Sequence, residues 1–104
     1  MNVETKTRAF KALGDPTRLR IVEILSCCPE MLEGPTAGEI CYEVAGTETI
    51  NSTVSHHLKE LREAGLIHVE RQGKTRCCSL NRESLRDLVQ CLQAFIEGDR
   101  NECC

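Results

Sequence analysis

One stretch of the chain, residues 51–66, predicts a helix with a defined start, a defined end and two different faces. Ser52 is the expected N-cap, because its hydroxyl can accept a backbone N–H of the first turn. Gly65 tolerates the backbone conformation that ends a helix, and Leu66 can fold back over it. Apolar residues recur at the helical spacing i, i+4 and i+7 and form one buried stripe: Val54, Leu58 and Leu61.

The other face of this predicted helix carries small polar groups near its start and cations toward its end. These residues are Ser55, His56, Lys59 and Arg62. A helix in a DNA major groove uses such groups, with short donors and acceptors at base edges and cations at phosphates. The solvated face of an ordinary surface helix has a similar composition. These residues alone therefore leave both interpretations open.

A short helix is expected directly before this stretch. Thr36 and Glu39 have the S/T-x-x-E spacing of a capping box, in which each side chain satisfies a backbone N–H of the other residue. Residues 45–51 then form a turn into the polar-faced helix. A short helix, a tight connection and a second helix make a helix-turn-helix arrangement.

Two more helices are expected nearer the N-terminus. Residues 3–13 form the first of them. Asp15 is the expected N-cap of the second, and Pro16 takes its first position, where the missing N–H of proline costs nothing. This helix ends at Cys27 and Cys28.

After Gly65 the apolar period changes from 3.6 to 2, which predicts a β-hairpin. Residues 71–74 form its glycine-containing tip, and residues 75–80 form the return strand. Three cations surround the tip: Arg71, Lys74 and Arg76. Such a hairpin is expected to act as a wing that contacts phosphates or a minor groove. Local charge of this kind matters more for DNA binding than the formal net charge of −3.

Asn81 is the expected cap of a last helix, whose apolar face is wider than packing on a small domain requires. That face consists of Leu85, Leu88, Val89, Leu92, Phe95 and Ile96. With one Tyr, two Phe and no Trp, the core of this chain is light, and light cores often gain stability by dimerisation. The first and last helices are therefore the expected dimer interface.

Eight cysteines in 104 residues require an explanation. The charged N-terminus has no apolar signal segment, and no run of about 18 apolar residues predicts a membrane span. Six of the cysteines form vicinal pairs, at 27/28, 77/78 and 103/104, which suit neither ordinary disulfide loops nor a CxxC zinc site. Free thiols in the cytoplasm are expected, available for soft-ligand binding or redox sensing.

Three segments carry a resemblance to a known family: LGDPTRLRIVEIL (13–25), INSTVSHHLKELREAGLI (50–67) and VERQGKTRCCSL (69–80). They closely resemble the ArsR/SmtB winged-helix repressors, over roughly residues 8–97. The resemblance implies a mainly α fold with a small β-hairpin, a winged helix-turn-helix in the order α-α-α-α-β-β-α. It implies a domain over residues 1–97 and a flexible cysteine-containing tail over 98–104.

The same resemblance implies a cytoplasmic homodimer that binds double-stranded operator DNA, with no enzymatic activity, organic cofactor or membrane partner. The residues then expected at DNA are Asn51, Ser52, Thr53, Ser55, His56 and Lys59, together with Arg71, Lys74 and Arg76 of the wing. The wing and the resemblance together favour the groove-facing interpretation of Ser55 and His56. His57 keeps two interpretations, a phosphate contact or packing at the helix flank.

The sequence departs from the best-known sensing sites of this family. Cys41 matches the first thiol of a third-helix Cys-x-Cys motif, but Glu43 occupies the second position, so that site is incomplete. The last helix lacks the histidines of the zinc sensors. Strand alternation separates the side chains of Cys77 and Cys78, so both are expected to fill space rather than chelate together.

Cys103 and Cys104 differ from the other cysteines because the polar tail offers them no core to fill. They are the expected ligands of trivalent arsenic or another thiophilic ion, such as antimony, cadmium or lead. Cys91 or a cysteine of the partner subunit would complete the set, although a buried hydrophobe is the default for both Cys41 and Cys91. For Cys27 and Cys28, thiolate ligation and simple packing remain open.

The expected function is thus a repressor released from its operator by arsenite or methylarsenite bound to cysteine thiolates. One alternative keeps the fold and changes the signal to thiol oxidation or persulfide formation. Another alternative is a small thiol enzyme or metal carrier. That class of protein requires a CxxC motif or a cysteine with a supporting base, and neither is evident.

Overall fold

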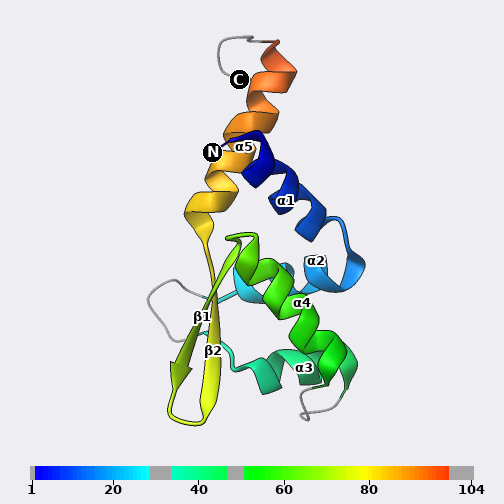
Figure 1. Cartoon of the computed structure of the whole chain (residues 1–104), viewed down its shortest axis with the longest axis vertical. Helices are drawn as coiled ribbons and strands as arrows, with labels where there is room; N and C mark the ends of the chain where they lie inside the picture. Colours follow the sequence, from blue (N-terminus) through cyan, green and yellow to red (C-terminus); the bar gives the residue numbers. More distant parts are fainter. Residues whose placement is uncertain (1, 29–33, 47–50, 99–104) are drawn as a thin grey trace.

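The computed structural model describes residues 2–28, 34–46 and 51–98. Within these ranges five helices and one antiparallel hairpin follow each other: α1 (Val3–Leu13), α2 (Pro16–Ser26), α3 (Ala37–Ala45), α4 (Ser52–Glu63), β1 (Ile67–Gln72), β2 (Thr75–Leu80) and α5 (Arg82–Glu97). The order α-α-α-α-β-β-α is the predicted one (Figure 1). The winged helix-turn-helix fold class is therefore confirmed.

Two of the predicted helix starts are confirmed in atomic detail. The Asp15 carboxylate accepts the backbone N–H groups of Thr17 and Arg18 at 3.0 and 3.1 Å. The bond from the Arg18 N–H is the main reason that the pKa of Asp15 lies below its ordinary value. At the start of α3, the Thr36 hydroxyl accepts the Glu39 N–H at 3.1 Å, and Glu39 accepts the Thr36 N–H in return.

The N-cap predicted for α4 was wrong by one residue. Asn51, not Ser52, has the extended backbone of a cap, and its side-chain oxygen accepts the Val54 N–H at 2.8 Å. Ser52 is already the first helical residue. The predicted end is confirmed, since Gly65 adopts a φ of +77° and the Leu66 N–H donates to the Leu61 carbonyl at 3.0 Å.

The core lies where α2, α3 and α4 meet the base of the hairpin (Figure 1). Its largest fully buried side chains are aliphatic residues and two cysteines: Ile21, Leu25, Ile40, Leu61, Leu66, Cys41 and Cys78. No aromatic side chain is among the buried residues of the described part of the chain. The core is therefore as light as the composition predicts.

A short backbone bridge joins the start of α3 to β2. The Cys78 N–H donates to the Pro35 carbonyl at 2.9 Å, and Thr36 pairs with Cys77. At Gly34 the chains approach so closely that a Cβ would collide with the Cys78 carbonyl oxygen. These backbone contacts fix β2 of the hairpin to the start of α3.

The molecule is elongated, with principal extents of 47, 27 and 19 Å. Its radius of gyration is 14.9 Å, against about 13 Å for a compact chain of this length. The C-terminal part of α5 projects at one end of the molecule, and the hairpin tip and α3 lie at the other (Figure 1). None of the helices in the described ranges combines the length and apolar character that a membrane crossing requires.

Candidate nucleic-acid interface

Helix α4 presents a polar stripe opposite to its buried stripe. Ser52, His56 and Lys59 recur at i, i+4 and i+7, and all three are exposed. Thr53 is also exposed, while Ser55 is half-buried at the edge of the stripe. The structure thus places five of the predicted DNA-contacting residues on the solvent side of one helix.

Both the oxygen and the nitrogen of the Asn51 side-chain amide make hydrogen bonds within the protein. Its oxygen caps the helix at Val54, and its nitrogen donates to the Cys41 sulfur at 3.9 Å. The buried Cys41 of α3 therefore contacts the N-cap residue of α4. Residues 47–50, which complete the predicted turn between α3 and α4, lie outside the described residues.

His57 points to the other side of α4 from His56. Its side chain is only 14% exposed, and its Nδ1 lies 3.1 Å from the Arg18 guanidinium and 3.8 Å from the Asp15 carboxylate. Of the two interpretations left open for His57, packing at the helix flank is therefore the one that the structure shows. The adjacent imidazoles, with ring centroids 6.0 Å apart, occupy different environments.

The hairpin places its cations together near its tip. Arg71 and Arg76 are directly opposite each other across the two strands, and Lys74 lies in the two-residue turn. All three side chains are exposed. Two like charges on opposite positions destabilise a hairpin unless an anion lies near them. Arg71 and Arg76 share their sheet face with the buried Cys78, and so project from the core side of the hairpin.

The two groups of polar residues lie at the same end of the molecule. The hairpin tip and the start of α4 both lie far from the C-terminus of α5 (Figure 1). Hydroxyl and imidazole groups on a helix can pair with base edges, and flanking cations can pair with phosphates. Together they make a surface suited to duplex DNA, with a helix for the groove and a wing for the backbone.

The cysteines of the described part of the chain are in different environments. Cys27 is exposed, Cys28 and Cys77 are half-buried, and Cys41, Cys78 and Cys91 are buried. Cys77 and Cys78 point to opposite faces of β2, as the strand pattern predicts. Burial raises the pKa of the Cys78 thiol to about 11, which keeps it protonated.

The predicted inducer ligands are only partly within the described residues. Cys91 lies on the inner side of α5 with Leu88 and Ala94 and is 8% exposed. Cys103 and Cys104 lie outside the described residues. Among residues 2–28, 34–46 and 51–98, no three His, Cys, Asp or Glu side chains gather in a way that could hold a metal ion.

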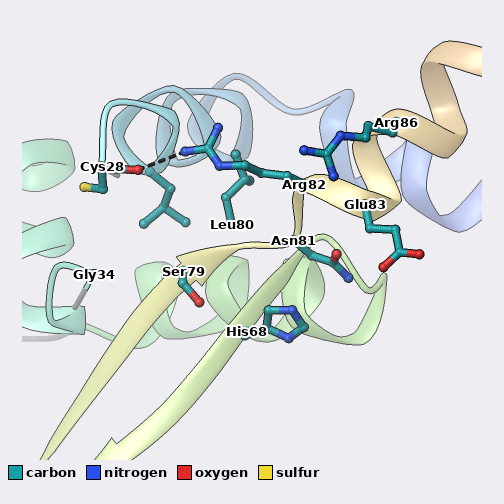
Figure 2. Close-up of a pocket in the computed structure, with 10 residues that line it drawn as sticks. Cys28, Gly34, His68, Ser79, Leu80, Asn81, Arg82, Glu83 and Arg86 are labelled. Carbon is teal, nitrogen blue, oxygen red and sulfur yellow. Dashed lines mark hydrogen bonds between the residues drawn. The ribbon is translucent and has the colours of Figure 1, made fainter. Parts of the chain in front are cut away.

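A polar pocket of about 350 Å³ opens at the start of α5, between the hairpin and the end of α2. Figure 2 shows Arg82 reaching across it to donate to the Cys28 carbonyl at 2.8 Å. The Cys28 thiol instead contacts the Ile24 carbonyl at 3.8 Å. His68, Ser79 and Arg86 also line the pocket. Sequence reasoning missed this pocket because three elements distant in sequence build it.

Comparison with known proteins identifies similar chains. A family model described as a helix-turn-helix domain matches residues 13–70, which is more than half of the chain. A Staphylococcus aureus protein named a cadmium resistance transcriptional regulatory protein CadC homolog is 38% identical over 91 residues, covering 86% of this chain and 66% of that protein. The arsenical resistance operon repressor of Staphylococcus xylosus is 28% identical over 106 residues, covering all of this chain and 92% of that repressor.

A solved structure agrees with these relatives at the level of the fold. It is the crystal structure of an ArsR family transcriptional regulator, with a TM-score of 0.73 and 24% sequence identity. The match covers 89% of this chain and 93% of that one. The similar proteins are transcriptional regulators rather than enzymes.

Proposed function

Because the chain belongs to the ArsR/SmtB family of winged helix-turn-helix repressors, we propose that it represses transcription from an operator and is released by trivalent arsenic bound to cysteine thiolates. The observation that carries the DNA-binding part is the polar stripe of α4 beside the paired arginines of the hairpin. The proposed readers are Ser52, Thr53, Ser55, His56 and Lys59, with Asn51 at the edge of the groove. Arg71, Lys74 and Arg76 contact phosphates.

The proposed inducer site uses Cys103 and Cys104 of the tail, with Cys91 as a third ligand. The names of two relatives, a cadmium resistance regulator and an arsenical resistance repressor, support a thiophilic inducer. Two or three thiolates suit the pyramidal coordination of trivalent arsenic, whereas zinc is almost always held by four ligands. Residues 1–97 form the DNA-binding and dimerisation domain in this proposal, and residues 98–104 form the sensing tail.

The tail is long enough to bring its thiols to Cys91. Glu97 lies six positions after Cys91 along the helix, a rise of about 9 Å. Six further residues from Glu97 to Cys103 can span up to about 20 Å when extended. Because Cys91 is buried, its thiol can become a ligand only if α5 shifts from the residues that cover it. Inducer binding therefore disturbs the end of the molecule at which the two subunits meet.

The partner at that end is a second copy of the chain. Exposed apolar side chains line the C-terminal half of α5 and the start of α1: Val3, Val89, Leu92, Phe95 and Ile96. Ile96 is 77% exposed and Phe95 is 57% exposed, an arrangement unfavourable in a monomer. A twofold pairing through this face would give the dimer two copies of α4, one for each half of a symmetric operator.

Replacing Ile96 by Glu is expected to shift the protein from dimer toward monomer, because a carboxylate would be buried in the apolar contact. Sedimentation velocity at micromolar concentration measures the change, and the dissociation constant should rise at least about 100-fold. Gln90→Glu, which adds the same charge on the polar side of α5, is the control and should remain dimeric. A dimer unaffected by Ile96→Glu would place the interface elsewhere.

A titration of the wild-type protein tests the proposal as a whole. Fluorescence anisotropy on upstream DNA should show specific binding that weakens as salt rises. Arsenite should then lower the affinity by about 5- to 150-fold, the usual range of allosteric coupling. Zinc is the control and should have little effect. Release by polysulfide but not by arsenite would instead indicate a persulfide sensor.

A further inference from the structure

Arg18 connects three helices although it belongs to an apolar segment of α2. Its Nε donates to the Ala12 carbonyl of α1 at 2.8 Å, and its Nη1 lies 3.1 Å from the His57 Nδ1 of α4. Its backbone N–H donates to the Asp15 carboxylate that caps α2. One side chain therefore joins the end of the first helix to the middle of the DNA-reading helix.

The chemistry of the two side chains gives this contact a direction. A guanidinium group can only donate hydrogen bonds, so the His57 Nδ1 accepts from Arg18 when the imidazole proton is on Nε2. The Asp15 carboxylate lies 3.8 Å from the same Nδ1. The Ala12 carbonyl belongs to the last turn of α1, where carbonyls have no partner within the helix. Arg18 thus satisfies a helix end and an imidazole with one rigid, planar group.

The contact adds to the buried Val54, Leu58 and Leu61 in fixing the rotation of α4 about its own axis. Successive helical residues differ by 100°, so holding His57 inward holds His56 and Ser52 outward. Side-chain atoms lie about 6 Å from the helix axis, and a rotation of about 20° therefore displaces them by about 2 Å. Such a displacement exceeds the tolerance of a hydrogen bond to a base edge.

A second link between α1 and α4 is weaker. Arg8 pairs with Glu63 at 2.9 Å, but both side chains are exposed, so solvent screens the pair. The Arg18 contact is more enclosed, because the His57 side chain is nearly buried. Arg18 is therefore the stronger candidate for transmitting a displacement of α1 to α4.

We propose that Arg18 is a positioning residue for DNA binding, which holds the reading helix α4 in register with α1 through His57 and the Ala12 carbonyl. This inference rests on the proposed function, since it assigns a route by which a change at the α1 and α5 end reaches operator DNA. Arg18 itself does not contact DNA in this proposal. Its loss changes affinity by releasing the rotation of α4.

The proposal can be tested by two substitutions, one at each partner of the hydrogen bond between Arg18 and His57. Arg18→Gln and His57→Leu should each weaken operator binding by about tenfold, the effect of losing one charge-assisted hydrogen bond. The double variant should be no weaker than either single variant, because both changes remove the same contact. Arg20→Gln is the matched control, since within the described part of the chain Arg20 makes only an exposed pair with Glu23, and it should bind like wild type.

A conservative change separates positioning from general destabilisation. The side-chain oxygen of Asn occupies nearly the place of the histidine Nδ1, so His57→Asn keeps the acceptor and should recover most of the affinity lost in His57→Leu. Additive effects in the double variant, or equal losses for His57→Asn and His57→Leu, would overturn the proposal. Thermal melting of every variant shows whether a change in stability accounts for a loss of binding.

An imidazole spectrum provides a readout that needs no DNA. In wild type, ¹⁵N shifts of His57 should show a proton on Nε2 and an accepting Nδ1, and Arg18→Gln should alter that pattern. An unchanged pattern in Arg18→Gln would overturn the positioning role whether or not DNA binds. A wild-type protein that shows this pattern but binds no operator would overturn the proposed function instead.

Discussion

Replacing Ser55 and His56 together by alanine should lower operator affinity by about 30-fold or more while leaving the protein folded and dimeric. Each good contact to a base edge contributes about 1–3 kcal/mol of discrimination. His56 is exposed and Ser55 is half-buried, so their truncation should change the free energy of unfolding by no more than about 0.5 kcal/mol. Anisotropy titrations on the operator and on scrambled DNA measure the loss of affinity and of specificity.

The hairpin offers a control with the same residue types. His68 and Ser79 are exposed cross-strand partners on the face of the hairpin away from Arg71 and Arg76. His68→Ala combined with Ser79→Ala removes one imidazole and one hydroxyl, as the test variant does, and should leave the affinity unchanged. Equal losses in the two double variants would argue against α4 as the reading helix.

Replacing Cys103 and Cys104 together by serine should abolish arsenite-induced release without changing operator binding in the absence of arsenite. Serine hydroxyls are poor ligands for a soft ion, so the coupling factor should fall from about 5–150 to near one. Operator-bound protein titrated with arsenite gives this factor directly. The affinity of the arsenite-free variant checks that the tail is not needed for DNA binding.

The vicinal pair at the end of α2 provides the control for the tail variant. Cys27 is exposed and Cys28 is half-buried, so both thiols are more accessible than those of the core. Cys27→Ser combined with Cys28→Ser should keep the full arsenite response. If this variant lost arsenite-induced release and the tail variant kept it, the inducer site would lie at the end of α2 instead.

Most of the architecture follows from rules that act within a few residues. The bounds of α1, the Asp15-Pro16 start of α2, the Thr36 capping box and the hairpin were predicted and are confirmed. The predicted hairpin tip, residues 71–74, was too long, because Arg71 and Gln72 pair within the strands and leave a two-residue turn. Capping, apolar period and strand alternation are local properties, so the sequence states them directly. The one misplaced cap, Ser52 for Asn51, arose because two adjacent residues can both accept a first-turn N–H.

The sequence by itself thus determined the family, the elements and the polar face of α4, because each depends on residue type and local spacing. Only the tertiary structure decided which histidine faces solvent and which faces Arg18, since 39 residues separate Arg18 from His57. The same holds for the contact of Asn51 with the buried Cys41 and for the pocket beside α5. These features depend on how elements distant in sequence pack against one another, and that packing cannot be predicted from local sequence patterns.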